Sequence, residues 1–429
     1  MELCLTLDHR FLQTPDNRIW TVTQGHYSFY SEYLDVFDRV RIIARGFPVP
    51  NAQSNFLPVE GPGVEFFPVS SYKGPVQFIA RYPSIHRSLR TAVPLRSAVI
   101  FRAPSQVANS VERSIRNRRH PYALDVVADP YDVLSPGANP HPLAPLARMY
   151  FTLNLKEQAK RAVAISYVTQ SYLQKRYSPR KDAYIMPPVE ENSSFDQRID
   201  GGRQYVVGVS DASLPEDWFR DEPRKSLQDP RVIRVLFIGT LGSLYKGPDT
   251  LIRAVAISRL AEIRVLVRFA GSGKQTEHLK ALCSELGVSD QITFLGDVQI
   301  GAPIREEIDR ADVFVLPSRA EGVPRAMLEA MARSLPCLGS HVGGIPELLH
   351  EEDRIPPNDV TALAAKFTEL ARDRSRIERM SIRNYQTARK YATQALRDRR
   401  RNFLLAVRER TAERLKSAHS TIVSMQARP

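Results

Sequence analysis

The second half of the chain alternates short apolar runs with longer segments of helical composition, and this alternation restricts the fold more than any other feature. Short apolar runs bounded by turn residues are typical of buried strands, and helices between such strands form parallel βαβ units. The predicted strands are Val232–Ile238, Ile263–Phe269, Ile292–Leu295, Val313–Leu316 and Cys337–Ser340, and the predicted helices are Pro248–Ile257, Gln275–Leu286, Ile304–Asp309, Pro324–Arg333 and Ile345–Leu349. The sequence therefore predicts an α/β fold with a parallel sheet, whose ligands bind outside the carboxyl ends of the strands.

The first half contains the same kinds of element in a less regular order. The predicted strands are Leu3–Leu7, Val40–Ala44, Ala98–Arg102, Leu124–Ala128 and Val163–Tyr167, and the predicted helices are Tyr27–Phe37, a basic helix before Leu124, Leu153–Ala162 and Gln170–Tyr177. Residues 46–76 are rich in proline and glycine and show no clear period. These segments predict a second, looser α/β domain.

A chain of 429 residues is too long for one compact core and is expected to form two domains. We assign residues 1–214 to an N-terminal domain and residues 232–385 to a C-terminal domain. The polar, proline-bearing stretch 215–231 is the predicted linker. Residues 386–417 are expected to form a C-terminal helix that can pack back on the N-terminal domain, and residues 418–429 are expected to be a tail.

Composition indicates a basic protein without membrane spans, but it does not show which anionic partner the protein binds. The formal net charge is +13 and the pI is about 9.7, which favours an anionic partner such as nucleic acid, anionic lipid or a phosphorylated substrate. No window reaches the length of a membrane span, and the N-terminus lacks a signal-peptide pattern. The three scattered cysteines form no CxxC pair. We therefore expect a cytoplasmic protein.

Two carboxylates, Glu321 and Glu329, stand eight residues apart across the start of a predicted helix. Pro324 is predicted as the first helical residue, where its missing N–H needs no partner. The backbone N–H groups of residues 322–325 then lack intrahelical partners and favour an anion. Beside such an anion site, carboxylates are suited to accept hydrogen bonds from sugar hydroxyls, and a nucleotide-sugar supplies both a diphosphate and diols.

The segment IGTLGSLYKG, residues 238–247, follows the first strand of the C-terminal half. Lys246 precedes the next helix and would bring a positive charge to a diphosphate. Taken alone, Lys246 is better explained as an ordinary solvated lysine. Because this loop and the Glu321 loop follow strands of one parallel sheet, we favour the functional interpretation.

The segment AGSGKQ, residues 270–275, is similar to a phosphate-binding loop but lacks its key positions. Arg268 stands where the first glycine of a Walker A loop would fall, and Gln275 stands where Ser or Thr would bind magnesium. We therefore reject a P-loop ATPase. Gly271 and Gly273 are instead expected to let the chain approach a nucleotide closely.

Together these segments resemble the retaining glycosyltransferases of the GT-B fold, in particular glycosyltransferase family 4. SRAEGVPRAMLEAMARSLPCLGSHVGGIPEL resembles the E-x7-E donor-binding segment, GTLGSLYKG the phosphate loop, and FAGSGKQ and ITFLGDV fall in the expected order between them. The resemblance covers roughly residues 232–349. It implies two Rossmann-like domains that face across a cleft, with no metal and no cofactor beyond the nucleotide-sugar donor.

The resemblance also implies roles for individual residues. Glu329 would bind the ribose diol and Glu321 the transferred sugar, and Lys246 would neutralise the diphosphate. Backbone N–H groups at Gly322 and Val323 would help to hold the donor. Residues from Phe294 to Val298 would line the base pocket.

One position departs from the family pattern. An arginine is expected directly after the glycine that ends the first strand, and Thr240 stands there instead. Arg325, at the start of the key helix, is our candidate for the missing phosphate cation. The alternative is that Arg325 is only a surface residue.

The N-terminal half resembles the family weakly, because the usual glycine pair after the first strand is absent. A family histidine that faces the donor sugar aligns with Asp129 in LDVVADP. A carboxylate there could orient an acceptor hydroxyl or take its proton. The alternative is that Asp129 caps a turn before Pro130.

Two basic stretches remain, Arg113–Arg119 and Lys156–Arg161 with the cations around residues 175–181. They are either solvated faces or a surface that contacts an anionic membrane and a lipid-linked acceptor. The predicted function is transfer of a sugar to a glycan or lipid-linked acceptor, in the cytoplasm or at the inner face of the membrane. The alternatives are a sugar-nucleotide epimerase of the same fold or a basic nucleic-acid-binding protein, although no nucleic-acid-binding motif is present.

Overall fold

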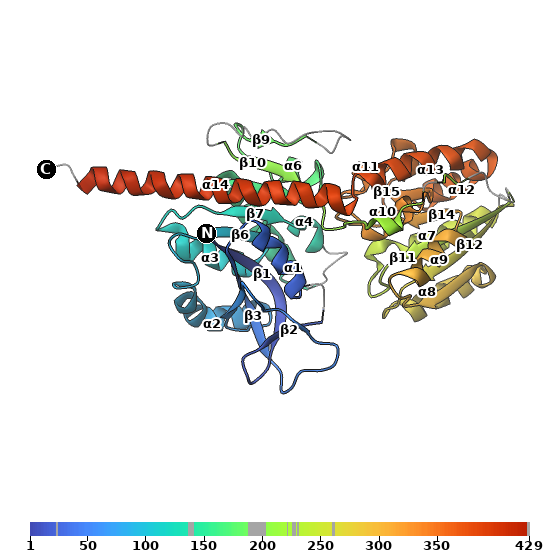
Figure 1. The fold of residues 1–429 in the computed structure, drawn as a ribbon. Helices are drawn as coiled ribbons and strands as arrows, with labels where there is room; N and C mark the ends of the chain where they lie inside the picture. The colour runs from blue at the N-terminus through green and yellow to red at the C-terminus, as the bar shows by residue number, and fades with distance from the viewer. Residues whose placement is uncertain are drawn as a thin grey trace. The chain divides into compact units, whose positions relative to one another are not determined.

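The computed structural model describes residues 1–22, 25–135, 141–187, 203–220, 222–224, 229, 231–259 and 262–426. The chain divides into two compact units, each with a sheet and flanking helices (Figure 1). The first unit comprises Met1–Pro130, Met149–Val209 and Asp398–Pro429, and the second comprises Tyr131–Arg148 and Ser210–Arg397. Residues 131–148 thus group with the second unit, although we assigned them to the N-terminal domain, and the chain returns to the first unit near its end.

The sheet of the second unit has six parallel strands in the order β13-β12-β11-β14-β15-β16. They are β11 (Val232–Ile238), β12 (Arg264–Ala270), β13 (Ile292–Gly296), β14 (Val313–Leu316), β15 (Cys337–Ser340) and β16 (Arg354–Ile355). The five strands predicted from the sequence are confirmed to within one residue at each end. Strand order reverses between β11 and β14, so the carboxyl ends of these two strands form the topological switch point.

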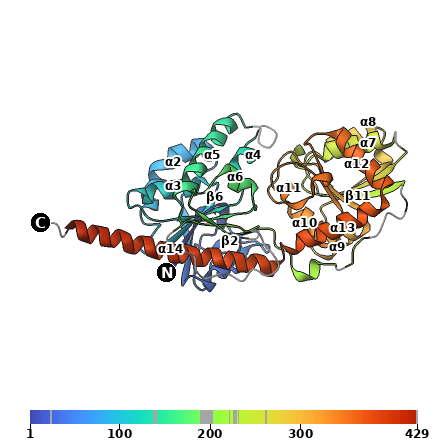
Figure 2. The same ribbon diagram turned by 90° about the horizontal axis from the view of Figure 1, so that it is seen from above.

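Helices cover both faces of this sheet. They are α7 (Pro248–Arg259), α8 (Thr276–Glu285), α9 (Ala302–Arg310), α10 (Arg325–Ala332), α11 (Ile345–Leu348), α12 (Val360–Arg372) and α13 (Arg374–Arg389). Figure 2 shows α7, α8 and α12 on one side and α9 and α13 on the other. The placement of Pro324 inside the helix was wrong: Pro324 is the N-cap, with extended backbone at ψ 113°, and the helix begins at Arg325.

The sheet of the first unit is parallel along the path β5-β3-β1-β6-β7-β8-β10-β9, with β2 and β4 antiparallel at one end of β1. Its strands are β1 (Glu2–Gln13), β2 (Ile19–Thr21), β3 (Arg39–Pro48), β4 (Leu57–Pro58), β5 (Val64–Val69), β6 (Ala98–Ala103), β7 (Ala123–Val126), β8 (Ala164–Tyr167), β9 (Tyr184–Ile185) and β10 (Tyr205–Gly208). The sequence pattern missed the short strands β2, β4 and β9, and it also missed the longer strands β5 and β10. Both pair in register with neighbours that were predicted, β3 and β8.

The helices of this region are α1 (Tyr27–Ser31), α2 (Gly74–Leu89), α3 (Gln106–Arg116), α4 (Pro130–Val133), α5 (Ala144–Arg161), α6 (Tyr172–Arg176) and α14 (Thr393–Gln426). Side chains of α2, α3 and α5, including Ile85, Val111 and Leu155, share one apolar core with the sheet. The expected C-terminal helix, residues 386–417, corresponds mainly to α14, but α14 begins only at Thr393. The prediction of a tail from residue 418 was wrong, because α14 continues to Gln426. Arg399 and Arg408 of α14 donate to the carbonyls of Gly208 and Val36 at 2.9 and 2.6 Å, within the first unit.

The stretch that we assigned to a linker packs on the second unit where it is described. Trp218 is buried, and the Arg224 guanidinium donates to the carbonyls of Ile308 and Ala311 at the end of α9 at 2.9 and 2.7 Å. Residues 221, 225–228 and 230 of this stretch lie outside the described residues. The described part is therefore anchored rather than free.

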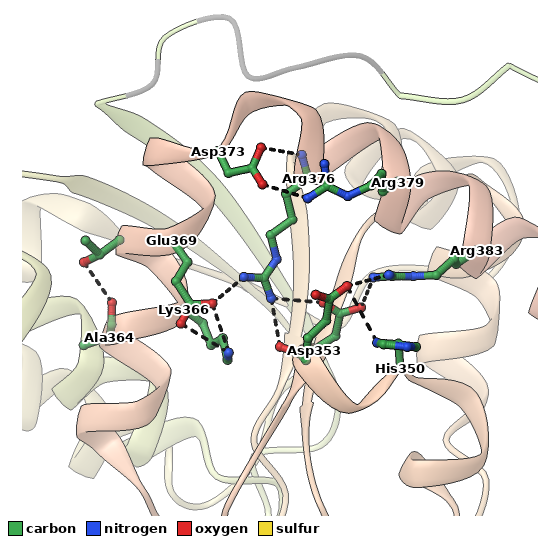
Figure 3. Close-up of polar contacts among 11 residues, drawn as sticks. His350, Asp353, Ala364, Lys366, Glu369, Asp373, Arg376, Arg379 and Arg383 are labelled. Atoms are coloured by element: carbon green, nitrogen blue, oxygen red, sulfur yellow. Dashed lines mark hydrogen bonds and ion pairs between the residues drawn. The ribbon is translucent and has the colours of Figure 1, made fainter.

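A network of ion pairs joins α12 and α13 to the strand β16 region (Figure 3). The Asp353 side chain is completely buried and accepts from Arg376 at 3.1 Å and Arg383 at 2.7 Å. Arg376 also pairs with Glu369 and donates to the Glu352 carbonyl. Burial raises the pKa of Asp353, and the two guanidinium groups act in the opposite direction. The network thus ties the last strand of the sheet to the two helices that follow it.

We expect Asp353→Asn to lower the free energy of unfolding of the second unit by roughly 3 kcal/mol, because the buried Arg376 loses a charged partner. Urea unfolding measures this change. The matched control is Asp217→Asn, which removes an exposed carboxylate that pairs with Arg305 and is expected to cost less than about 1 kcal/mol. Equal effects of the two substitutions would contradict the structural role of Asp353.

Candidate active site

The predicted site residues of the second unit gather at the switch point of its sheet. The loop after β11 contains a short 3-10 turn, Leu244–Lys246, and leads into α7. The loop after β14 contains Glu321 and leads into α10. Ligands of open parallel sheets bind outside the carboxyl ends of the strands where the order reverses. The fold therefore places both loops where a ligand is expected.

Lys246 and Glu321 form an ion pair that joins these two loops. The Lys246 ammonium donates to Glu321 Oε1 at 2.8 Å, and the Ser318 hydroxyl donates to the same oxygen at 2.9 Å. Burial lowers the pKa of Lys246, but Glu321 and the adjacent Tyr245 raise it by more, so the lysine is a cation at neutral pH. Glu321 Oε2 has no hydrogen-bond partner in the described part of the chain and stays available to a ligand.

Backbone N–H groups are available beside this ion pair. In the described structure the N–H groups of Gly322, Val323 and Arg325 donate no hydrogen bond, whereas the Gly322 carbonyl accepts from Gly344 at 2.9 Å. Gly322 itself is exposed. Such groups at the start of a helix favour an anion, and the Lys246 ammonium adds a full positive charge.

Glu329 lies one turn inside α10 and is largely buried. The Arg325 Nε donates to Glu329 Oε1 at 2.9 Å, and the Arg325 side chain is 42% exposed. Burial raises the pKa of Glu329, and Arg325 only partly offsets that effect. Arg325, our candidate for the missing phosphate cation, thus pairs with Glu329, which we predicted to accept hydrogen bonds from the ribose.

Gly271 and Gly273 bring the loop after β12 against the loop after β11. A Cβ atom on Gly271 would lie 2.0 Å from the Gly239 carbonyl oxygen, and one on Gly273 would lie 2.1 Å from the Gly242 nitrogen. Both glycines have positive φ values, 143° and 159°. A side chain at either position would push the two loops apart. Their role here is close contact between loops of the protein.

The other residues predicted for the donor site lie in the loop after β11, on β13 and in the loop after β13. The Thr240 hydroxyl accepts from the Gly242 N–H at 3.1 Å, so Thr240 closes a turn at the position of the missing family arginine. Phe294 stacks on the buried Phe269 with ring centroids 5.2 Å apart. Val298 is half-buried in the loop after β13. Phe294 and Val298 supply apolar surface that suits a nucleotide base.

Asp129 belongs to the first unit and follows β7. Its carboxylate accepts from the Tyr177 hydroxyl at 2.5 Å and pairs with Arg176 at 2.8 Å. Burial and the hydrogen bond to Asp129 raise the pKa of Tyr177. The carboxylate is buried and held in a fixed orientation by α6 and Tyr177.

The sequence analysis missed Arg319, which fixes the geometry of the Lys246 loop. Its guanidinium makes two hydrogen bonds to Asp249, at 3.0 and 2.7 Å, and also donates to the Leu244 carbonyl. Its backbone N–H donates to the Tyr245 carbonyl at 2.6 Å. Asp249 lies in the first turn of α7, so Arg319 ties the loop after β14 to the loop after β11. An arginine two residues before a motif glutamate is a weak signal, because its partners are distant in sequence.

A cavity of about 1010 Å³ opens elsewhere on the same unit. It is lined by residues 234–236 of β11, by β12 as far as Arg268, and by α9, with Arg234 and Arg310 among its side chains. These arginines pair with Asp312 and Glu307. The cavity lies away from the carboxyl ends of the strands, so we do not place the active site there.

The match to a protein family lies in the C-terminal half of the chain. Residues 219–389 match the family model described as glycosyl transferases group 1. CapJ of Staphylococcus aureus is 22% identical over 365 residues, which is 85% of this chain and 84% of CapJ. WcaL of Salmonella typhimurium, provisionally named a colanic acid biosynthesis glycosyltransferase, is 32% identical over 136 residues, or 30% of this chain and 33% of WcaL.

Solved structures share the fold over nearly the whole chain. Sucrose-phosphate synthase of Thermosynechococcus elongatus has a TM-score of 0.61 at 15% identity and covers 94% of this chain and 98% of its own. HepE of Anabaena, solved with UDP and glucose, has a TM-score of 0.56 at 15% identity and covers 97% of this chain and 100% of its own. At this identity the likeness concerns the fold.

The two α/β units therefore have the GT-B architecture of glycosyltransferases. Residues 219–389 are similar to the glycosyl transferases of group 1, and this match supports a glycosyltransferase. The predicted fold class and the predicted resemblance to glycosyltransferases of the GT-B fold are confirmed. Within the described residues, no helix is long and apolar enough to cross a bilayer.

We expect Arg319→Lys to weaken binding of the nucleoside diphosphate about tenfold, because lysine keeps the charge but cannot form the two-pronged contact with Asp249. Calorimetry with whichever of UDP, GDP and ADP most stabilises the protein measures this loss. The control is Arg253→Lys, an exposed position on the same helix as Asp249. Unchanged binding by the Arg319 variant would show that the loop holds its shape without this contact.

Proposed function

We propose that this chain is a retaining glycosyltransferase of family 4 that moves a sugar from a nucleotide-sugar to a glycan or lipid-linked acceptor. The observation that carries the proposal is the Lys246–Glu321 ion pair at the switch point of the second sheet. It brings together a phosphate-binding cation and a hydroxyl-binding carboxylate from two separate loops. The UDP and glucose bound to HepE and the name of WcaL support a nucleotide-sugar donor and a role in cell-surface polysaccharide or glycolipid biosynthesis.

The proposed donor site uses each group according to its chemistry. Lys246 and the free N–H groups of Gly322 and Val323 receive the diphosphate, since both carry positive charge. Glu321 accepts from hydroxyls of the transferred sugar through Oε2, and Glu329 accepts from the ribose diol. The base lies against apolar surface from Phe294 to Val298.

Catalysis in this proposal depends on stabilising the leaving diphosphate. As the glycosidic bond breaks, negative charge develops on the diphosphate oxygens, where the Lys246 ammonium and the oriented N–H groups stabilise it. These groups are fixed by the ion pair and by Arg319 before the donor binds, so little reorganisation accompanies the reaction. We propose that this positive charge serves without a metal ion.

Arg325 has two proposed roles that differ in their consequences. It can replace the arginine that Thr240 displaces and contact the diphosphate directly. Alternatively, it acts through Glu329, with which it pairs at 2.9 Å. We favour the second role because the contact with Glu329 is present in the structure.

Asp129 is the proposed acceptor-side residue. A carboxylate already engaged by Arg176 and Tyr177 is better suited to orient an acceptor hydroxyl than to remove its proton. In this role the Asp129 carboxylate accepts a hydrogen bond from the acceptor hydroxyl. We further propose that the enzyme works at the inner face of the membrane when its acceptor is lipid-linked.

We expect Lys246→Ala to lower kcat by about 100-fold or more, because the developing diphosphate charge loses its cation. Glu329→Ala is expected to raise the donor KM by roughly tenfold through loss of charged hydrogen bonds. A thermal-shift panel of UDP-, GDP- and ADP-sugars selects the donor, and transfer assays then measure both variants. The controls are Lys280→Ala and Glu277→Ala, an exposed pair on α8. Full activity of both site variants would overturn the donor-site assignment.

We expect Arg325→Gln to shift the acidic limb of the pH profile of kcat/KM for the donor to higher pH. Glu329 must be ionised to accept hydroxyl protons, and its pKa is already raised by burial. Loss of the Arg325 charge raises this pKa further, so protonation begins at higher pH as the solution is acidified. A uniform fall in kcat at every pH would instead indicate that Arg325 contacts the diphosphate.

We expect Asp129→Asn to lower kcat with the natural acceptor by about tenfold or more, with little change in the donor KM. Tyr177→Phe, which removes one hydrogen bond but keeps the carboxylate, is expected to have a smaller effect. Steady-state kinetics of both variants, with their melting temperatures, test this order. An unchanged kcat for Asp129→Asn would reduce Asp129 to a structural residue.

A further inference from the structure

Helix α2 and the segments on either side of it carry positive charge without any negative charge. Residues 66–111 contain no Asp or Glu, and they contain six basic residues. These are Lys73, Arg81, Arg87, Arg90, Arg96 and Arg102. Such a run within a folded unit creates a strongly positive surface wherever its side chains are exposed.

One face of α2 is buried, and the opposite face is apolar at one end and basic at the other. Ile85 and Leu89 pack into the core of the first unit. The exposed positions 76, 79, 83, 87 and 90 recur at spacings of three and four residues and so form one stripe. Val76 and Ile79 on this stripe are 76% and 70% exposed, unusually high values for such large apolar side chains.

Most basic side chains of this surface are exposed and unpaired in the described structure, so they can contact an anionic partner. In the described structure, Lys73, Arg87, Arg90 and Arg96 are exposed and make no side-chain hydrogen bond or ion pair. Arg81 differs, since it donates to the Ser71 carbonyl. No compensating carboxylate is available nearby in the sequence to neutralise the free cations.

The basic stretches that we identified from the sequence differ from α2 in this respect. Arg116 and Arg161 pair with Glu112, and Lys160 pairs with Glu157 at 2.9 Å. Arg176 pairs with the buried Asp129. Much of the charge in those stretches is therefore neutralised within the first unit, which the sequence could not show.

We propose that the exposed stripe of α2, Val76 to Arg90, docks on an anionic lipid bilayer, with Val76 and Ile79 entering the interface and Arg87 and Arg90 contacting headgroup phosphates. A helix that combines exposed aliphatic residues with arginines on one side is suited to lie in the plane of a bilayer surface. Each arginine near such a surface adds electrostatic attraction. The proposal rests on the proposed function, in which the acceptor is lipid-linked.

The chemistry of the stripe distinguishes a bilayer from other anionic partners. Sequence-tolerant binding of single-stranded nucleic acid uses exposed aromatic platforms. The aromatic residues of α2, Phe78 and Tyr82, are half-buried and contact each other and Tyr72. The exposed apolar residues are aliphatic, which suits acyl chains better than bases.

Sedimentation with vesicles tests the proposal on the full chain. The wild-type protein is expected to sediment with vesicles of phosphatidylglycerol mixed with phosphatidylcholine, and to be released by high salt. Pure phosphatidylcholine vesicles are expected to bind it weakly. Arg87→Gln/Arg90→Gln is expected to reduce the partition coefficient by about fivefold for each arginine, and Val76→Ser/Ile79→Ser by roughly tenfold.

Matched controls separate the surface from net charge and general hydrophobicity. Arg253→Gln/Arg264→Gln removes two exposed arginines from the second unit, and Ile300→Ser removes an aliphatic side chain that is 78% exposed. Both controls are expected to bind vesicles as the wild type does. If the control arginines matter as much as those of α2, or if duplex DNA displaces the protein from vesicles, the assignment to α2 and lipid is overturned.

The donor-induced thermal shift, measured without vesicles, keeps this inference separate from the proposed function. Both α2 variants are expected to show the wild-type shift with the nucleotide-sugar, which also verifies that they are folded. If the wild type binds vesicles but shows no donor-induced shift, the proposed function is overturned, whereas the inference that α2 docks on a bilayer stands. A donor-induced shift without vesicle binding would overturn the lipid surface alone.

Discussion

A buried charge must be compensated, and the ion pair between Lys246 and Glu321 provides this compensation in the proposed donor site. The two residues come from loops after β11 and β14, the strands at which the order of the sheet reverses. Each would be costly to bury alone. Their contact therefore fixes both loops relative to each other. Glu321 Oε2 and the N–H groups of Gly322 and Val323 have no hydrogen-bond partner within the described residues.

The surrounding contacts make this pair rigid. Arg319 joins the two loops a second time through Asp249, and Gly271 allows the loop after β12 to approach the carbonyl of Gly239. A site held by such contacts before a ligand arrives can stabilise charge without reorganising, which is the electrostatic requirement of a reaction whose leaving group is a diphosphate. At the position of the family arginine, Thr240 instead closes a turn at the start of the loop that contains Lys246.

The first unit has two groups of basic residues, and they differ in whether carboxylates of the same unit pair with them. Around α3 and the end of α5, arginines are paired with Glu112 and Glu157 and contribute mainly to the packing of these helices. Along α2, the arginines have no acidic neighbours and stand beside exposed aliphatic residues. Arg116 of α3 and Arg161 of α5 are thus paired with carboxylates of the same unit, whereas the arginines of the α2 stripe have no ion-pair partner in the described structure.

The sequence by itself determined the strands of the second unit and the GT-B class, and it predicted Lys246, Glu321 and Glu329 as one set of site residues. Buried parallel strands are short apolar runs, and loops at their carboxyl ends must share one edge, so local pattern carries this information. Only the tertiary structure revealed β5, β10 and α2, whose apolar faces are completed by neighbours distant in sequence. It also decided that Pro324 precedes its helix, that Arg319 holds the Lys246 loop, and which arginines stay unpaired. Ion pairs and helix packing depend on contacts between residues that are distant in the sequence. The local spacing of apolar residues carries no information about such contacts.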